Sequence, residues 1–228
     1  MEDTIQEVNY QTVHYNNIDS PHYLISILYT CFELYFTHSA RSSKKVDYIH
    51  NYFIKVIENI VIKNIFNNKY HCKTEVKVPS CNSSGNKSCD IVLFKNDIPF
   101  IIFPLKLIMT NYKQNKNNYF ENLTGEMTHL KWNNTELHII PINIIFNELP
   151  YLNKENIITK FEKIKYDETF IIYEKLVEHK LATTMFNYII NLRHNSNIGD
   201  KYLLPEIINF DENTPFKSLE NTILPLLD

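Results

Sequence analysis

The sequence predicts a mixed α/β fold, in which helices flank a central mixed β-sheet. Two stretches before residue 67 have apolar residues at helical spacing, and three strand-like stretches follow between residues 70 and 109. A helical stretch and an apolar strand come next and end at residue 146. A helix that joins the third and fourth strands makes them parallel neighbours in a right-handed connection.

The first two elements are predicted to be helices. Ser20 and Pro21 have the residue types favoured at a helix N-cap and at the first helical position. Apolar residues then recur at helical spacing from Leu24 to Tyr35. A second helix is predicted over residues 44–66, where the apolar residues again fall on one face.

The next three elements are predicted to be the strands of a meander. Residues 70–78 alternate between polar and apolar types, as expected of a half-buried strand. After a polar loop, residues 89–94 and 98–109 are mostly apolar. Asn96 and Asp97 between them have the residue types of a tight hairpin turn.

The rest of the chain is predicted to alternate between helix and strand. Residues 111–118 form a segment rich in Asn, Gln and Lys, and residues 119–132 have helical spacing. Residues 137–146 are a strongly apolar strand, and a long helix is predicted over residues 168–192. Because no repeat or linker divides the chain, residues 1–228 are expected to form a single domain with helical additions at both ends of its core.

Composition indicates a globular protein without an overall basic charge. The 228 residues are 44% apolar, and the formal net charge is −3. The charge is uneven, because residues 63–87 contain five lysines and one acid, whereas residues 205–228 contain one lysine and five acids. A local basic cleft near residue 90 is compatible with DNA binding. Chance placement of lysines in a Lys-rich chain explains the same pattern.

The sequence predicts a cytoplasmic protein without a membrane segment. Its four cysteines show no CxxC spacing and no Cys/His series, which argues against a structural zinc site. The N-terminus is polar and acidic rather than typical of a signal peptide. The longest apolar run, residues 98–109, contains Pro104 and Lys106 and is too short to span a bilayer.

Asp90 and Lys106 are the first candidate catalytic residues. Asp90 opens a predicted strand, and Lys106 lies within the apolar strand beside it. Carboxylates bind Mg²⁺ through hard oxygen atoms, and a lysine ammonium stabilises charge on a phosphate. Each residue alone has an ordinary structural explanation, as a strand-capping Asp or as a Lys at a sheet edge. Together, on adjacent strands, they indicate a metal-dependent site that cleaves phosphodiester bonds.

Over residues 44–146 the chain resembles the PD-(D/E)xK nuclease superfamily, especially type II restriction endonucleases. That family has a core of helix, three strands, helix and strand, with an aspartate opening the second strand and an acid-x-lysine motif in the third. Asp90 and Lys106 match the aspartate and the lysine. The resemblance implies a restriction-endonuclease-like core, Mg²⁺-dependent cleavage of double-stranded DNA at a specific palindromic site, and a homodimer.

The acid of the family motif is missing, because Pro104 stands two residues before Lys106. Some restriction enzymes carry this acid on the helix that follows the third strand. Glu121 and Glu126 lie in that predicted helix, and Glu121 is favoured because it is nearer the predicted start. Glu75, on the neighbouring strand, is expected to be a further metal ligand or a base that positions water.

Polar residues near these strands are candidates for DNA contacts. Amide side chains pair with adenine edges, and lysines bind phosphate or guanine. The expected contact residues are Lys87, Lys113, Gln114, Asn115, Lys116, Asn117 and Asn118. An ordinary solvated loop is the alternative both for the segment around Lys87 and for residues 113–118. At the level of function the alternatives are a non-catalytic DNA-binding or interaction protein on a nuclease-like fold, which Pro104 favours, and a DNA repair or junction nuclease.

Overall fold

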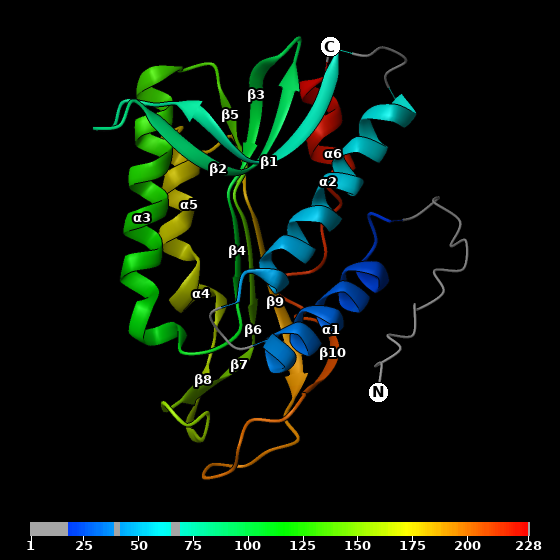
Figure 1. Cartoon of the computed structure of the whole chain (residues 1–228), viewed down its shortest axis with the longest axis vertical. Coiled ribbons are helices and arrows are strands. Elements are labelled where there is room, and N and C mark those ends of the chain that lie inside the picture. Colours follow the sequence, from blue (N-terminus) through cyan, green and yellow to red (C-terminus); the bar gives the residue numbers. More distant parts are fainter. Residues whose placement is uncertain (1–17, 39–41, 65–68, 228) are drawn as a thin grey trace, which may run out of the picture.

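Helices cover both sides of a central mixed β-sheet, as the sequence predicts (Figure 1). The computed structural model describes residues 18–38, 42–64 and 69–227. The expected polar N-terminus and the expected end of the second helix at Phe66 lie outside those residues. Within them, no helix is both long and apolar enough to cross a bilayer.

Two helices precede the sheet, as predicted. They are α1, Pro21–His38, and α2, Lys44–Asn64. The N-cap prediction is confirmed, because the Tyr23 N–H donates to Ser20 Oγ at 3.3 Å. The apolar side of α1 packs on the sheet, where the rings of Phe32 and Phe146 lie 5.0 Å apart.

Three strands form the predicted antiparallel meander. They are β1, Tyr70–Pro79, β2, Asn86–Lys95, and β3, Ile98–Phe103. Asn96 and Asp97 both have positive φ, 51° and 63°, as a tight hairpin turn with the right-handed twist of the strands requires. The turn prediction is therefore confirmed.

The third and fourth predicted strands are each interrupted at a proline. β3 is followed through Pro104 by β4, Leu105–Ile108, and β5, His138–Ile139, is followed through Pro141 by β6, Ile142–Phe146. A proline has no N–H to donate to a ladder, so the continuous strands predicted over 98–109 and 137–146 are wrong in this detail. The parallel arrangement is confirmed, because β3 pairs with β5 and β4 pairs with β6.

The interruption at Pro104 separates two four-stranded sheets. One has the order β1-β2-β3-β5 and the other has the order β10-β9-β6-β4. β2 pairs with β3 only as far as Ile91 and Phe103. β4 is therefore the edge strand of its own sheet. Asp90 precedes Ile91 in β2, so it lies where β2 separates from the strand that continues as β4.

The predicted long helix over 168–192 is wrong. That region contains α4, Tyr166–Thr169, α5, Ile171–Glu178, and β9, Phe186–Arg193, which pairs with β6 in parallel. Lys180 has φ 59° and ends the helical stretch. An apolar run buried in a sheet cannot be told from a buried helix by periodicity alone. This region therefore contributes two short helices and a strand of the sheet in place of one long helix.

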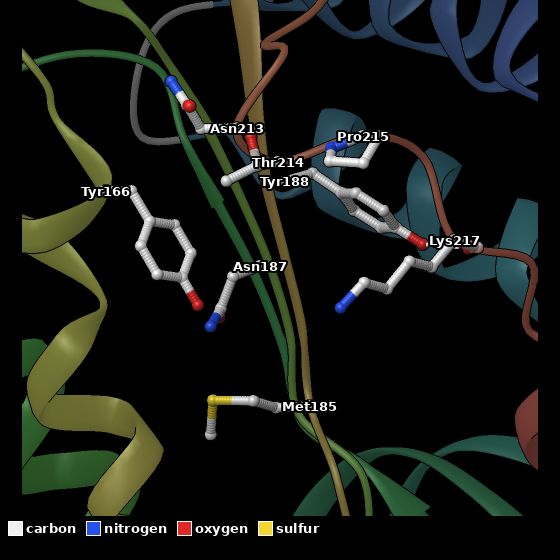
Figure 2. Close-up of a pocket in the computed structure, with 8 residues that line it drawn as sticks. All are labelled: Tyr166, Met185, Asn187, Tyr188, Asn213, Thr214, Pro215 and Lys217. Carbon is white, nitrogen blue, oxygen red and sulfur yellow. Dashed lines mark hydrogen bonds between the residues drawn. The ribbon is translucent and has the colours of Figure 1, made fainter.

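The remaining elements are two helices on the faces of the sheets, the edge strand β10, and a separate two-stranded sheet of β7 and β8. They are α3, Tyr112–Asn133, β7, Glu148–Leu152, β8, Ile158–Lys163, β10, Glu206–Phe210, and α6, Glu220–Ile223. In Figure 1, α3, α4 and α5 lie on one side of the sheet, and α1, α2 and α6 lie on the other. A small cavity of about 70 Å³ opens at the edge of β9, between Tyr166 and the segment 213–217 (Figure 2).

Candidate active site

A cavity of about 290 Å³ lies where β2 separates from β4. Both sheets and both helical sides contribute to its wall. Its lining includes Asp90 from β2, Pro104, Lys106 from β4, Asn143 from β6, Val46 from α2, Tyr173 from α5, and Tyr119, Asn122, Leu123 and Glu126 from α3. Asp90 and Lys106, the two residues first singled out in the sequence, therefore line one cavity.

Asp90 is tied to the strand that carries Lys106. Its Oδ2 accepts a hydrogen bond from the Leu105 N–H at 2.8 Å. β4 has no neighbouring strand on this side, so the carboxylate satisfies a backbone donor that a β-ladder would otherwise take. One carboxylate oxygen is thus fixed by the protein, and Oδ1 is left for another partner.

Lys106 projects from β4 into the same space. Its ammonium nitrogen lies 4.7 Å from the centre of the Tyr119 ring, at cation–π distance. The Lys106 residue is exposed, whereas Leu105 before it is buried. An ammonium group at the mouth of a cavity presents a compact positive charge with three donors, which suits a phosphate oxygen.

Glu126 supplies the second carboxylate of the cavity. Its side chain is 16% exposed, and its Oε2 lies 3.1 Å from Lys87 Nζ. Burial raises the pKa of Glu126; the charge and hydrogen bond of Lys87 lower it, the charge of Asp90 raises it, and Lys106 lowers it. Asp90 and Lys106 are therefore close enough to Glu126 for their charges to act on it.

Glu121, the acid favoured from sequence, does not line this cavity. The expectation that it lies near a helix start is wrong, because α3 already begins at Tyr112. On that helix Tyr119, Leu123 and Glu126 share a face at intervals of four and three residues. Glu121 falls off this face and is exposed. The structure thus brings Glu126, the sequence alternative, to Asp90.

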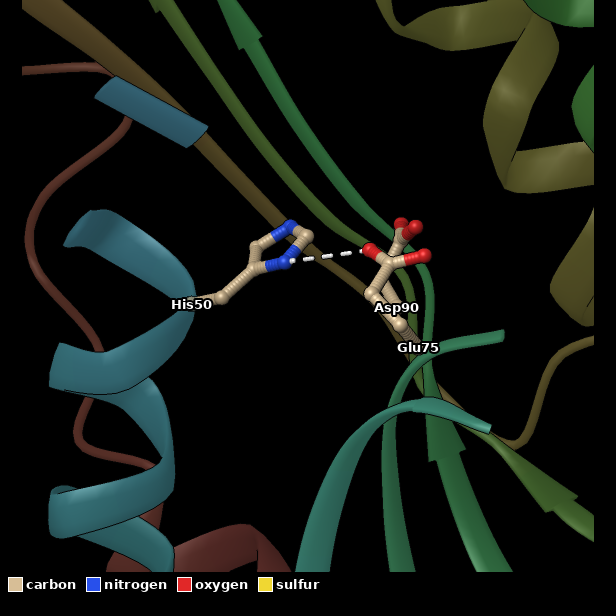
Figure 3. A group of neighbouring side chains, drawn as sticks. All are labelled: His50, Glu75 and Asp90. Atoms are coloured by element: carbon tan, nitrogen blue, oxygen red, sulfur yellow. Dashed lines mark ion pairs between the residues drawn. The ribbon is translucent and has the colours of Figure 1, made fainter. Parts of the chain in front are cut away.

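A second group of side chains meets Asp90 from the side of α2 (Figure 3). Ligand atoms of His50, Glu75 and Asp90 all lie within 4.8 Å of one another. His50 Nδ1 is 3.6 Å from Glu75 Oε1. The pairs that flank Glu75 and Asp90 in the β1–β2 ladder place these two acids opposite each other.

His50 is the residue that sequence reasoning missed. It is 2% exposed, and its Nε2 has no hydrogen-bond partner among the described residues. Its spacing from Val46 and Phe53 puts it on the buried face of α2. The sequence signal for His50 is a polar residue on an otherwise apolar helix face. This signal is weak, because such a histidine is more often structural than functional.

These residues can hold a divalent cation. The carboxylates of Asp90 and Glu75, with Glu126 on the other side of Asp90, provide the hard oxygen ligands that Mg²⁺ prefers. The buried imidazole with an unpaired nitrogen adds a ligand type that suits Mn²⁺ and other transition metals. The donor set therefore accommodates Mg²⁺ and does not restrict the site to it.

The candidate DNA-binding residues lie on helix rather than loop. α3 includes the whole stretch from Lys113 to Asn118, and its side chains are exposed apart from the half-buried Asn115. Gln114 accepts a hydrogen bond from the Tyr151 hydroxyl at 2.9 Å. Lys87, the other candidate, is paired with Glu126 at the cavity.

Comparison of the chain with protein-family models, curated proteins and solved structures gives no match. The likeness to PD-(D/E)xK nucleases therefore depends on Asp90, Lys106 and the order of the elements around them. Any functional conclusion has to be argued from the chemistry of the cavity itself.

Proposed function

We propose that this protein is a metal-dependent endonuclease of the type II restriction class, which hydrolyses phosphodiester bonds in double-stranded DNA. The observation that carries the proposal is that Asp90, Lys106 and Glu126 line one cavity where β2 and β4 part. The order helix, three strands, helix and parallel strand supports the same family likeness. The missing acid at Pro104 has a substitute in Glu126.

Each of these side chains has a distinct chemical task. Asp90 would hold the cation, together with Glu126 or with His50 and Glu75, while its Oδ2 accepts from the Leu105 N–H. A bound Mg²⁺ would supply Lewis-acid stabilisation of the phosphate and an activated water. Lys106 donates to a non-bridging phosphate oxygen and stabilises the charge that develops there. Tyr119 holds the ammonium at the cavity mouth until substrate arrives.

The surroundings of the cavity fit a duplex substrate. The exposed lysines at the start of α3, Lys113 and Lys116, lie on the helix that carries Tyr119 and Glu126 into the cavity. They would bind backbone phosphates beside the cleaved bond. Cutting both strands of a palindromic site requires a twofold dimer. A cytoplasmic location belongs to the proposal and fits the free cysteines.

The alternative is a DNA-binding protein on the same fold without catalysis. The observation that favours it is Pro104, which removes the carboxylate expected directly before Lys106. The ion pair of Lys87 with Glu126 adds to this, because it occupies the substitute acid. The alternative predicts that the protein binds duplex DNA with the cleavage chemistry absent.

Incubation of the purified protein with supercoiled plasmid, with Mg²⁺ or with EDTA, separates these functions. Discrete fragments that require the metal support the proposal. Retarded but uncut plasmid supports the DNA-binding alternative, and a smear without discrete bands indicates a nuclease without site specificity. The Asp90→Asn variant, purified in the same way, controls for contaminating nuclease.

A further inference from the structure

A row of polar side chains crosses the centre of the parallel sheet. Lys106 pairs in register with Asn143, and Asn143 pairs with Asn187. Paired residues of neighbouring parallel strands point to the same face, so the row continues from the candidate active site to β9. Asn143 is 5% exposed in a strand whose other residues are fully buried and apolar. A buried amide is costly unless its polar atoms are hydrogen-bonded.

The row continues as a chain of hydrogen bonds toward the surface. Asn143 Nδ2 donates to Asn187 Oδ1 at 2.8 Å. Figure 2 shows the Tyr166 hydroxyl pointing toward the Asn187 amide. That hydroxyl donates to Glu174 Oε1 at 2.7 Å. Burial raises the pKa of Tyr166, Glu174 raises it further through its hydrogen bond and charge, and a hydrogen bond with the Asn187 side chain lowers it.

This chain of hydrogen bonds has one direction. A carboxylate oxygen of Glu174 accepts the hydrogen bond that the Tyr166 hydroxyl donates. The hydroxyl oxygen is therefore free to accept from the Asn187 amide that it points toward, which agrees with Asn187 using its Oδ1 as the acceptor for Asn143 Nδ2. The atom of Asn143 left over is Oδ1, and Asn143 lines the same cavity as Lys106. An exposed carboxylate on α5 thus fixes the orientation of a buried amide.

We infer that Asn143 is a positioning residue whose carbonyl oxygen accepts a hydrogen bond from the Lys106 ammonium and directs that cation toward phosphate. This inference rests on the proposed function, because it gives Lys106 the phosphate as its partner. An ammonium has three donors, so one bond to Asn143 leaves two for the substrate. Without it, the Tyr119 ring would attract the cation without fixing its direction.

The contact can be tested without any cleavage assay. In the isotope-labelled, metal-free full chain, the side-chain amide resonances of Asn143 are measured by NMR in wild type and in Lys106→Met. We expect them to shift in Lys106→Met and to broaden or double in Tyr166→Phe, which releases the orientation of Asn187. The matched control is Asn191, whose Nδ2 donates to Asn209 Oδ1 at 2.8 Å on β9 outside the cavity. Unchanged Asn143 resonances in Lys106→Met would overturn the inference.

The consequence for catalysis is tested by kinetics. We expect Asn143→Ala and Tyr166→Phe to lower kcat for plasmid cleavage about tenfold, the worth of one hydrogen bond to a charged group, with DNA affinity nearly unchanged. Asn191→Ala should match wild type. Tyr166→Phe keeps the test valid if Asn143→Ala does not fold. An equal loss in Asn191→Ala, or a loss confined to DNA affinity, would contradict the inference. If wild type cuts no DNA, the proposed function fails while the amide shift still decides the contact.

Discussion

The two groups of side chains that meet at Asp90 differ in how their charge is compensated. On the side of α3, Glu126 is 16% exposed and lies 3.1 Å from the Lys87 ammonium. On the side of α2, Glu75 is 61% exposed, and its neighbour is the imidazole of His50. The first acid is enclosed and already paired with a cation, and the second is open to solvent.

This difference determines what a metal ion meets on each side. A buried carboxylate stays ionised only with a compensating charge, so a metal that binds Glu126 competes with the Lys87 ammonium that already compensates it. On the side of α2, among the residues that the structure describes, no lysine or arginine pairs with Glu75 and the His50 Nε2 has no hydrogen-bond partner. Asp90 belongs to both groups. The comparison therefore indicates that every metal-dependent step needs Asp90, while the contributions of the two sides can be separated by mutation.

The largest effect is expected for Asp90→Asn, which removes the ligand that both sides share. The amide keeps an oxygen that can accept from the Leu105 N–H, so the fold should be retained. We expect the rate of DNA cleavage to fall on the order of a thousandfold, since one preorganised charged group is lost at the reacting phosphate. Gel assays measure the cleavage rate, and a thermal melt shows whether the fold is retained. Near-normal turnover in the folded variant would rule out the site.

A smaller but selective loss is expected for Glu126→Gln compared with Glu121→Gln. Both change one acid of α3 to its amide, but only Glu126 lines the cavity. We expect Glu126→Gln to reduce cleavage on the order of a hundredfold and Glu121→Gln to stay near wild type. Full activity in both variants would shift the role of second acid to Glu75. Loss in Glu121→Gln alone would make Glu121, and not Glu126, the second acid of the site.

Local sequence signals were sufficient for the meander that carries Asp90. Asn96 and Asp97 adopt the positive φ that the hairpin turn requires, and this turn starts the pairing of β2 with β3, whose register shifts by one residue between Leu93 and Phe94. That register, with the break at Pro104, brings Asp90 to the Leu105 N–H. The proximity of Asp90 and Lys106 was therefore predictable, because it depends on residues close together in the chain.

The choice between Glu121 and Glu126 was not predictable, because it depends on where α3 begins. No side chain caps the helix locally, and Asn111 before it has a left-handed backbone with φ 53°. The cap comes instead from β8, where Glu162 Oε2 accepts from the Lys113 N–H at 3.0 Å. A cap supplied by a distant strand leaves no local signal. His50 was missed for a similar reason, since its partners are on β1 and β2.

The side of α2 is tested by His50→Phe, which keeps an aromatic ring but removes both nitrogens. If His50 is a ligand, we expect the affinity for Mn²⁺ to fall roughly tenfold, with a smaller effect on Mg²⁺. The matched control is His71→Phe, because His71 also faces a carboxylate, Asp97, at 3.8 Å but is remote from the cavity. Calorimetric titration measures the affinities. Equal Mn²⁺ affinity in His50→Phe and wild type would assign the metal to the side of α3.

The smallest expected effect is on the pH dependence of stability, and it reports on Glu126 alone. Burial raises the pKa of Glu126 above its ordinary value of 4.5, so the folded protein holds this proton at higher pH than the unfolded chain does. Folded wild type should therefore lose stability as pH rises from the unfolded to the folded pKa, and the full loss should be present above the folded pKa.

Glutamine at position 126 does not titrate, so its presence removes this pH dependence. The ion pair with Lys87 exists only where Glu126 is ionised; it lowers the folded pKa of Glu126 without reversing the net rise, so the sign of the effect is kept. The difference in melting temperature, variant minus wild type, should then become more positive between about pH 4 and pH 8. Thermal melts in EDTA measure it, with the exposed Glu121→Gln as control. A difference that stays constant or falls with pH would show that Lys87 compensates Glu126 fully, and the contrast between the two sides of Asp90 would lose its basis.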